Sequence, residues 1–244
     1  MPSPPIPAVT PDQMSQVDRL MASELGVDVL QLMELAGLAV AQWARERFLR
    51  GDARGAEVLI LAGSGGNGGD GMAAARLLHA WGARPVVWLS HDATTLRGAA
   101  AHQAQSLAAL GLRLAPPPDP DRPIALPGAD LVIDALLGFG LSGPPTGAAA
   151  RLITAANDGD TPILAVDLPS GLDAGSGEPH QPCLRADATL TLALPKTGVL
   201  APAARPYIGD LAVADIGVPS EIYARVGVTV GPLFATGSIV RIEA

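Results

Sequence analysis

Residues 58–78, VLILAGSGGNGGDGMAAARLL, decide the fold class of this chain. An apolar run typical of a buried strand ends in the glycine-rich segment 63–71, and an alanine-rich, helix-forming segment follows at once. A strand that enters a helix through such a turn places free backbone N–H groups and the positive end of the helix dipole at one point. Nucleotide phosphates bind at such points. Asn67 and Asp70 within the turn indicate that it does more than hold phosphate.

Apolar runs and helix-forming segments alternate on both sides of this stretch. Strands are predicted at residues 58–62, 85–90, 129–135, 162–167, 188–194 and 211–216, and helices at about 10–24, from 28 to about 50, and at 71–81, 94–110 and 146–157. The alternation predicts an α/β fold, a three-layer Rossmann-like α/β/α sandwich with a mostly parallel central sheet. We expect residues 1–244 to form a single domain. Residues 115–127 are predicted to be an exposed connection, and residues 218–244 receive no assignment.

Composition excludes several classes of function. The net charge is −8 and no basic cluster occurs, which argues against nucleic acid as a partner. Cys183 is the only cysteine, so no intramolecular disulfide can form, and a reducing cytoplasm is the simplest location. Residues 1–9 lack the basic and continuous apolar regions of a secretory signal, and no apolar run is long enough to cross a bilayer. We therefore expect a cytoplasmic protein that does not bind membranes.

Polar, glycine-bearing loops follow three of the predicted strands. The first loop holds Asn67 and Asp70, a second begins at Asp134 and continues through the glycine-rich residues 138–143, and a third begins at Asp167. The carboxyl ends of parallel strands meet at one edge of the sheet, where open α/β folds bind ligands. The three loops together therefore predict one ligand site.

In these motifs the chain resembles the NAD(P)H-hydrate epimerases. Residues 66–71 are similar to the family's Asn-Asn-Gly-Gly-Asp-Gly run, and Asp134 with residues 138–143 resembles its aspartate followed by a glycine-rich loop. Residues 166–171, VDLPSG, resemble its Val-Asp-Ile-Pro-Ser-Gly motif. Residues 32–37, LMELAG, and 193–196, ALPK, match two further family segments in the same order along the chain.

The resemblance implies a role in the repair of nicotinamide cofactors. Hydration of the reduced ring leaves a hydroxyl group on C6 in the R or S configuration, and the family interconverts these two forms of NAD(P)HX. A separate ATP- or ADP-dependent dehydratase then restores the cofactor from the S form. Only a short tail follows Gly217, so we expect that dehydratase to be another chain. The resemblance also implies a homodimer, with the N-terminal helices as the candidate interface.

Inversion requires either that the C6 hydroxyl group leaves and returns or that the C6–N bond opens and closes. Either route moves a proton onto or off the oxygen, which one positioned carboxylate can do as general acid and base. We predict Asp167 for this role, because it ends a central strand; the resemblance implies that it also contacts the substrate. The resemblance further implies a potassium ion bound by Asn67, Asp134 and Ser170, which offer the oxygen ligands that hard cations prefer. It implies that phosphates and ribose of the dinucleotide contact two loops, formed by Gly66, Asn67, Gly68, Gly69 and Asp70, and by Gly138, Phe139, Gly140, Leu141, Ser142, Gly143 and Pro144.

Three positions depart from the family pattern. Gly66 replaces the first asparagine of the glycine loop, Leu35 stands where asparagine or arginine is common, and Ser142 stands where some members carry lysine. Lys196 is either a phosphate contact or an exposed charge at a strand end, and we favour the exposed charge.

Two alternative functions remain open at this point. Residues 63–68 fit the dinucleotide fingerprint of an NAD-dependent dehydrogenase, with Asp92 near the place of the ribose contact. That alternative leaves the Asp134 and Asp167 loops without a role. A non-catalytic nucleotide-binding protein would use the same pocket without turnover.

Overall fold

A computed structural model describes residues 6–242 of the chain. The strands are β1 (Glu57–Ala62), β2 (Arg84–Leu89), β3 (Leu114–Ala115), β4 (Leu131–Ala135), β5 (Ile163–Val166), β6 (Ala188–Leu192), β7 (Asp210–Ala214) and β8 (Ile239–Ile242). The helices are α1 (Pro11–Leu25), α2 (Val29–Arg47), α3 (Gly66–Ala80), α4 (Gly98–Ala109), α5 (Gly147–Asn157), α6 (Arg205–Ile208) and α7 (Ser220–Arg225), with short 3-10 helices η1 (Ala93–Thr95), η2 (Thr197–Leu200) and η3 (Pro202–Ala204). The first five residues of the segment 1–9, for which we expected no secretory signal, lie outside the described part.

The eight strands form one sheet in the order β3-β2-β1-β4-β5-β6-β7-β8. All neighbouring pairs are parallel except β7 and β8, which are antiparallel. The chain order reverses between β1 and β4, and such a switch point leaves a crevice at the carboxyl ends of the two strands. The predicted Rossmann-like α/β fold is confirmed, and its topology places the ligand crevice after β1 and β4.

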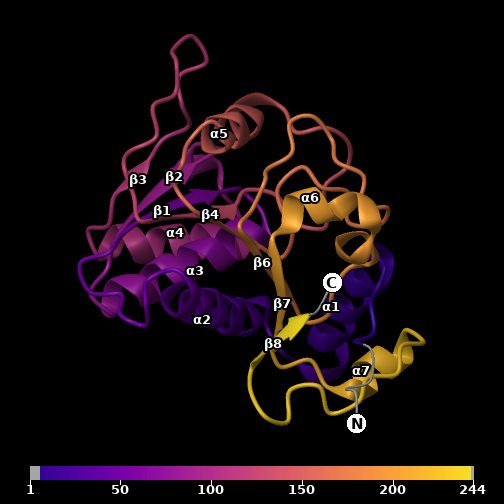
Figure 1. The fold of residues 1–244 in the computed structure, drawn as a ribbon. Helices are drawn as coiled ribbons and strands as arrows, with labels where there is room; N and C mark the ends of the chain where they lie inside the picture. Colours follow the sequence, from indigo (N-terminus) through magenta and orange to yellow (C-terminus); the bar gives the residue numbers. More distant parts are fainter. Residues whose placement is uncertain (1–5, 243–244) are drawn as a thin grey trace.

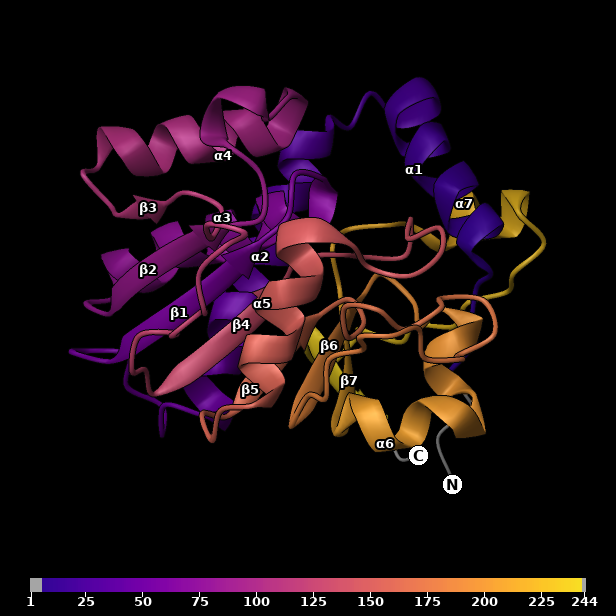
Figure 2. The same ribbon diagram turned by 90° about the horizontal axis from the view of Figure 1, so that it is seen from above.

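Helices cover both faces of the sheet (Figures 1 and 2). Buried side chains of α1 to α4 and α7 form one core with Ile60 of β1, whereas α5 packs with Leu59 and Leu61 of the same strand in a second core. Alternate side chains of a strand point to opposite faces, which explains this division. A third, smaller core lies beneath α6. The central strands β4, β5 and β6 are thus buried on both faces, as expected for a parallel sheet.

Capping residues set the starts of the first two helices. Thr10 caps α1 and forms a capping box with Gln13, and Asp28 does the same for α2 with Gln31. Such boxes satisfy backbone N–H groups that have no partner within the helix. These caps define where the chain enters α1 and α2. Both helices pass over the edge of the sheet that carries the ligand crevice.

Helix α3 begins at Gly66, whereas the sequence predicted its start at residue 71. The glycine-rich segment therefore forms the first turns of the helix, not an open loop. A side chain would not fit there: a Cβ atom on Gly68 would lie 2.0 Å from the carbonyl oxygen of Gly63, and one on Gly71 would lie 2.4 Å from Cβ of Ala135. The glycines thus allow the start of α3 to pack directly against β1 and β4.

Two further predictions needed correction. The single helix predicted at residues 94–110 is divided into η1 and α4, because Asp92 caps η1 and Gly98 turns the chain with a positive φ of 55°. The tail without assignment contains α7 and β8, and β8 pairs with the outer edge of β7. Within residues 6–242, no helix is long and apolar enough to pass through a membrane.

Candidate active site

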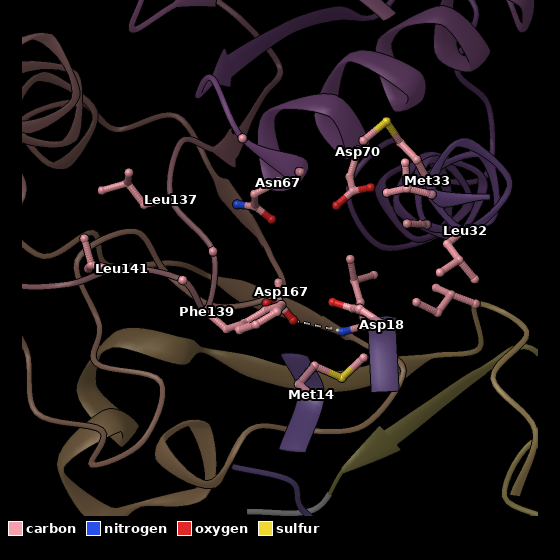
Figure 3. Close-up of a pocket in the computed structure, with 18 of the residues that line it drawn as sticks. Met14, Asp18, Leu32, Met33, Asn67, Asp70, Leu137, Phe139, Leu141 and Asp167 are labelled. Atoms are coloured by element: carbon pink, nitrogen blue, oxygen red, sulfur yellow. Dashed lines mark hydrogen bonds between the residues drawn. The ribbon is translucent and has the colours of Figure 1, made fainter. Parts of the chain in front are cut away.

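A cavity of about 740 Å³ lies at the carboxyl ends of β1, β4, β5 and β6, beneath α1 and α2 (Figure 3). Its apolar wall includes Met14 of α1 and Leu32 and Met33 of α2. Its polar side includes Asn67 and Asp70 of α3. Ligand pockets of small molecules have volumes of this order and this mixture of an apolar lining with few polar groups.

The cavity brings together most of the predicted substrate contacts. Among them, Gly66, Asn67, Asp70, Gly138, Phe139, Gly140, Leu141, Ser142 and Asp167 line it. Gly68, Gly69, Gly143 and Pro144 are not among its lining residues. Gly68 faces the backbone of Gly63, and a Cβ atom on Gly69 would lie 2.3 Å from Cε of Met33, so both of these glycines serve the packing of α3.

Asp167 follows β5 directly and is 3% exposed. Its backbone N–H continues the strand ladder by donating to the Leu190 carbonyl oxygen at 2.8 Å, while its φ of 69° turns the chain out of the strand. A residue other than glycine with such a φ is uncommon and is often found at functional sites. The Leu192 N–H donates to Oδ1 of Asp167 at 3.3 Å, which fixes the carboxylate further.

Lys196 forms an ion pair with Asp167, and the prediction that it is an exposed charge was wrong. The lysine is 1% exposed, and its Nζ also donates to the Leu192 carbonyl oxygen at 2.9 Å. The ring centroid of Phe139 lies 5.4 Å from Nζ, so the ammonium group also contacts the second substrate loop. A buried lysine needs such a partner because its unpaired charge would be costly to desolvate.

Asp70 and Asp18 bring two further carboxyl groups to the cavity. Burial raises the pKa of Asp70 well above its ordinary value; the negative charge of Asp167 raises it further, and Lys196 opposes the shift. Asp18 of α1 also has a raised pKa, again chiefly because the protein around it displaces water, although its side chain is open to the cavity. Three carboxyl groups therefore share one ammonium group.

Asp134 and Ser170 connect the second loop to the third. The Ser170 hydroxyl donates to Oδ1 of Asp134 at 2.7 Å and its backbone N–H donates to Oδ2 at 2.8 Å. The Leu137 N–H donates to the same hydroxyl oxygen at 2.9 Å. Burial raises the pKa of Asp134 to about 6, against the effect of these hydrogen bonds. The pair lies just outside the lining of the cavity.

Asn67 has the most unusual environment among the predicted potassium ligands. Both polar atoms of its side-chain amide are buried without a hydrogen-bond partner among residues 6–242. The loop at Gly138 covers it, since a Cβ atom there would lie 3.3 Å from Cβ of Asn67. Buried polar groups without a partner are costly and often mark a missing ligand. An amide, a carboxylate and a hydroxyl group together offer oxygen donors that fit a hard cation.

Other lining residues were missed by sequence reasoning. Met14 and Asp18 reach the cavity from α1, and His91 reaches it from the end of β2. Nothing in the sequence of α1 indicates which residues face the site. The burial of Lys196 and its pairing with Asp167 are visible only in the structure, because a charged residue after a strand is usually exposed. Asp92, the ribose contact of the dehydrogenase alternative, instead accepts hydrogen bonds from Thr94 in the cap of η1.

Comparisons with known proteins found relatives in both sequence and fold. The family described as YjeF-related protein N-terminus matches residues 29–198. An NAD(P)H-hydrate epimerase of Dehalogenimonas lykanthroporepellens is 38% identical over 98% of this chain and 94% of its own length. A second one, from Rhodopirellula baltica, is 36% identical over 91% of this chain and 89% of its own length.

Longer and more distant proteins also match. The bifunctional NAD(P)H-hydrate repair enzyme Nnr of Moorella thermoacetica is 39% identical over 88% of this chain, which corresponds to 41% of that enzyme. The crystal structure of the yeast protein YNL200c superposes with a TM-score of 0.78 at 24% identity, covering 97% of this chain and 100% of the yeast chain. This last likeness concerns the fold alone. The extent of the matches shows that this chain belongs to the YjeF-related protein N-terminus family, together with curated NAD(P)H-hydrate epimerases.

Proposed function

We propose that this chain is an isomerase that interconverts the R and S forms of hydrated NAD(P)H at C6 of the nicotinamide ring, with Asp167 as general acid and base. The epimerase activity is that of the curated relatives, which match nearly the whole chain. The observation that carries the role of Asp167 is its place. The buried carboxylate, paired with Lys196, lines the same cavity as the two predicted dinucleotide loops.

The substrate is a hemiaminal, because the C6 hydroxyl group is attached next to the ring nitrogen N1. Such a hydroxyl group leaves and returns readily once a proton is delivered to its oxygen and removed again. A carboxylate held in position can move that proton. The hydrogen bonds and the ion pair of Asp167 hold its carboxylate still, and a fixed position is what proton transfer requires.

The two loops lining the cavity are suited to the rest of the dinucleotide. Gly65 and Gly66 stand at the start of α3 without side chains, so the backbone N–H groups and the positive helix end are open to phosphate oxygens. Residues 138–142 line the same cavity. We place the pyrophosphate and ribose between these segments, with the hydrated ring toward Asp167.

Potassium is part of the proposal. Asn67, Asp134 and Ser170 would hold the ion, and the amide of Asn67, buried without a partner among residues 6–242, supports this assignment. When bound, the ion would supply positive charge that offsets the buried carboxylate of Asp134 and favours anionic parts of the substrate nearby. With the ion bound, the same three residues would connect the segments after β1, β4 and β5.

The proposal extends to partners and location. We propose a homodimer that uses the N-terminal helices, where Leu25, Val29 and Leu35 are large apolar residues with 48%, 56% and 42% exposure. We also propose that an ATP- or ADP-dependent dehydratase on another chain consumes the S form in the same reducing, cytoplasmic compartment. The bifunctional relatives named for NAD(P)H-hydrate repair support this coupling.

A coupled assay tests the function. The protein is added to the R hydrate of NADH with an S-specific dehydratase, its nucleotide and potassium chloride, and the recovery of NADH is followed by absorbance. We expect recovery to accelerate in proportion to the amount of the protein. A rate equal to that of spontaneous epimerisation, with the dehydratase fully active on the S hydrate, would contradict the proposal.

A further inference from the structure

Asp167 acts as base in one direction of the reaction and as acid in the other, but within a single inversion at C6 a fixed carboxylate serves only one face of the ring. If water leaves and returns, the C6–O bond breaks on one face of the ring and forms on the other. The group that protonates the leaving oxygen and the group that deprotonates the entering water must therefore lie on opposite faces. Asp167 is held by Lys196 and by the Leu192 N–H, so its carboxylate cannot follow the oxygen from one face to the other.

Asp70 provides a second carboxyl group in the same cavity. It lies one turn into α3 and enters the cavity from that helix, whereas Asp167 enters it from the end of β5 (Figure 3). The Asp70 carboxyl group makes no hydrogen bond or ion pair with another side chain or backbone group in the described range 6–242. Asp134, by comparison, is held by three hydrogen bonds. Asp70 is thus a half-buried acid that is free to meet a ligand in the cavity.

The charged groups around Asp70 favour its protonated form. Asp70 faces Asp167, Lys196 and Asp18, and His91 lines the same cavity from β2. Burial and the charges of the other two carboxylates raise the pKa of Asp70, and Lys196, the only cation among them, is bound to Asp167. A carboxyl group whose environment raises its pKa can keep its proton and act as a general acid.

We propose that Asp70 is a second catalytic residue, which acts on the face of the ring opposite to Asp167. This inference rests on the proposed function. Asp70 gives its proton to the C6 hydroxyl group, the C6–O bond breaks, water leaves, and the lone pair of N1 forms an N1=C6 double bond. Water then adds to the other face, the π electrons return to N1, and Asp167 accepts the proton of the entering water. The reverse reaction uses the same two groups in exchanged roles.

The pH dependence of kcat/KM tests this assignment in the full-length protein. Wild type is compared with Asp70→Asn and with Asp173→Asn, a control that removes a carboxylate outside the cavity. We expect a bell-shaped profile for wild type and for the control. In Asp70→Asn we expect kcat to fall by about 100-fold or more, KM to stay near the wild-type value, and the alkaline limb to disappear. Circular dichroism and thermal unfolding show that the variants are folded.

Isotope labelling supplies a second readout. In H₂¹⁸O, the wild-type enzyme should place one labelled oxygen on C6 for each inversion. An Asp70→Asn variant with wild-type kcat, or with a change in KM alone and both limbs preserved, would overturn the catalytic role of Asp70 while leaving the epimerase function in place. Inversion without ¹⁸O incorporation would overturn the water route. A wild-type protein without epimerase activity would overturn this inference together with the proposed function.

Discussion

The ammonium group of Lys196 and the carboxylate of Asp167 form an ion pair in the wall of the cavity, where the two residues are 1% and 3% exposed. One follows β6 and the other follows β5, so the pair joins the ends of two adjacent parallel strands. A buried pair of this kind adds little net stability over an apolar pair, but removing one partner leaves a costly charge. The pair therefore fixes the position of the Asp167 carboxylate. Replacing either partner alone would leave the other buried without its partner.

Replacing Lys196 by methionine should destabilise the protein by about 3–5 kcal/mol, because Asp167 would then be a buried carboxylate without its partner. Urea unfolding at pH 7 measures this change. The double variant Lys196→Met/Asp167→Asn should recover much of the loss. As a control, Arg84→Met removes the exposed pair with Glu57 at 3.0 Å and should change the free energy of unfolding very little. Equal changes in the free energy of unfolding for Lys196→Met and Arg84→Met would contradict the buried ion pair.

The raised pKa of Asp70 predicts a stability that decreases with pH. As the pH rises, the unfolded chain releases this proton near the ordinary pKa of about 3.9, before the folded protein does. The free energy of unfolding therefore falls above that pH, and the loss is complete above the raised pKa of the folded state. Asp70→Asn should accordingly be more stable than wild type at pH 8 and indistinguishable from it near pH 3.

Asp52 offers a control with the opposite sign. Hydrogen bonds from Arg54 lower the pKa of Asp52 to about 2, so its ionised form favours the folded state above the ordinary pKa, and that contribution is lost as the pH falls toward 2. Asp52→Asn should not gain stability at pH 8. Urea unfolding of both variants across this pH range measures the difference, and a gain at pH 8 in Asp52→Asn alone would refute the explanation.

Potassium should raise the melting temperature if the ion binds at Asn67, since a ligand that binds only the folded state stabilises it. Differential scanning calorimetry in KCl and in choline chloride at equal ionic strength measures the shift. Asn67→Ala should abolish it. Asn157→Ala is the matched control, because that amide joins Cys183 and Arg185 away from the cavity and should leave the potassium shift unchanged. A shift that survives in Asn67→Ala would remove this residue from the ion site.

Alanine substitutions in α3 should distinguish glycines that pack against the sheet from glycines with open space around them. Gly71→Ala should cost about 1–3 kcal/mol, because its new methyl group would lie 2.4 Å from Cβ of Ala135. Gly66→Ala should leave stability unchanged or raise it by up to about 1 kcal/mol, since no atom lies within 4 Å of the new methyl group and alanine favours the helix. Thermal unfolding of the two variants decides, and equal losses would contradict the close packing of α3 on β4.

The strand pattern predicted the fold, and the motifs at the strand ends predicted that their residues lie together in one site. Alternating apolar runs predicted the parallel sheet, and a parallel sheet brings Asn67, the loop after Asp134, and Asp167 to one edge. The start of α3 was misplaced because glycine has a low helix propensity. Close packing against Ala135 overrides that propensity, and only the assembled sheet reveals it.

The remaining site residues depend on contacts between distant segments. Asp18 belongs to α1, and the sequence does not distinguish the polar residues of this helix that face the site from those that face solvent. Only the packing of α1 across the sheet edge brings Asp18 to the cavity. The burial of Lys196 follows from the turn of η2 beneath Phe139. A charged residue after a strand is usually exposed, so its pairing with Asp167 required the tertiary structure.

The central claim is that Asp167 moves the proton during epimerisation of the NAD(P)H hydrate. Its most direct test starts from pure R hydrate and follows the appearance of the S form by chromatography, without a coupled enzyme, for wild type, Asp167→Asn and Asp173→Asn. Asp173 caps its own turn outside the cavity and serves as the control. We predict equal initial rates for wild type and the control, and a decrease of about 100-fold or more for Asp167→Asn with its fold intact. A wild-type rate in Asp167→Asn would contradict the account.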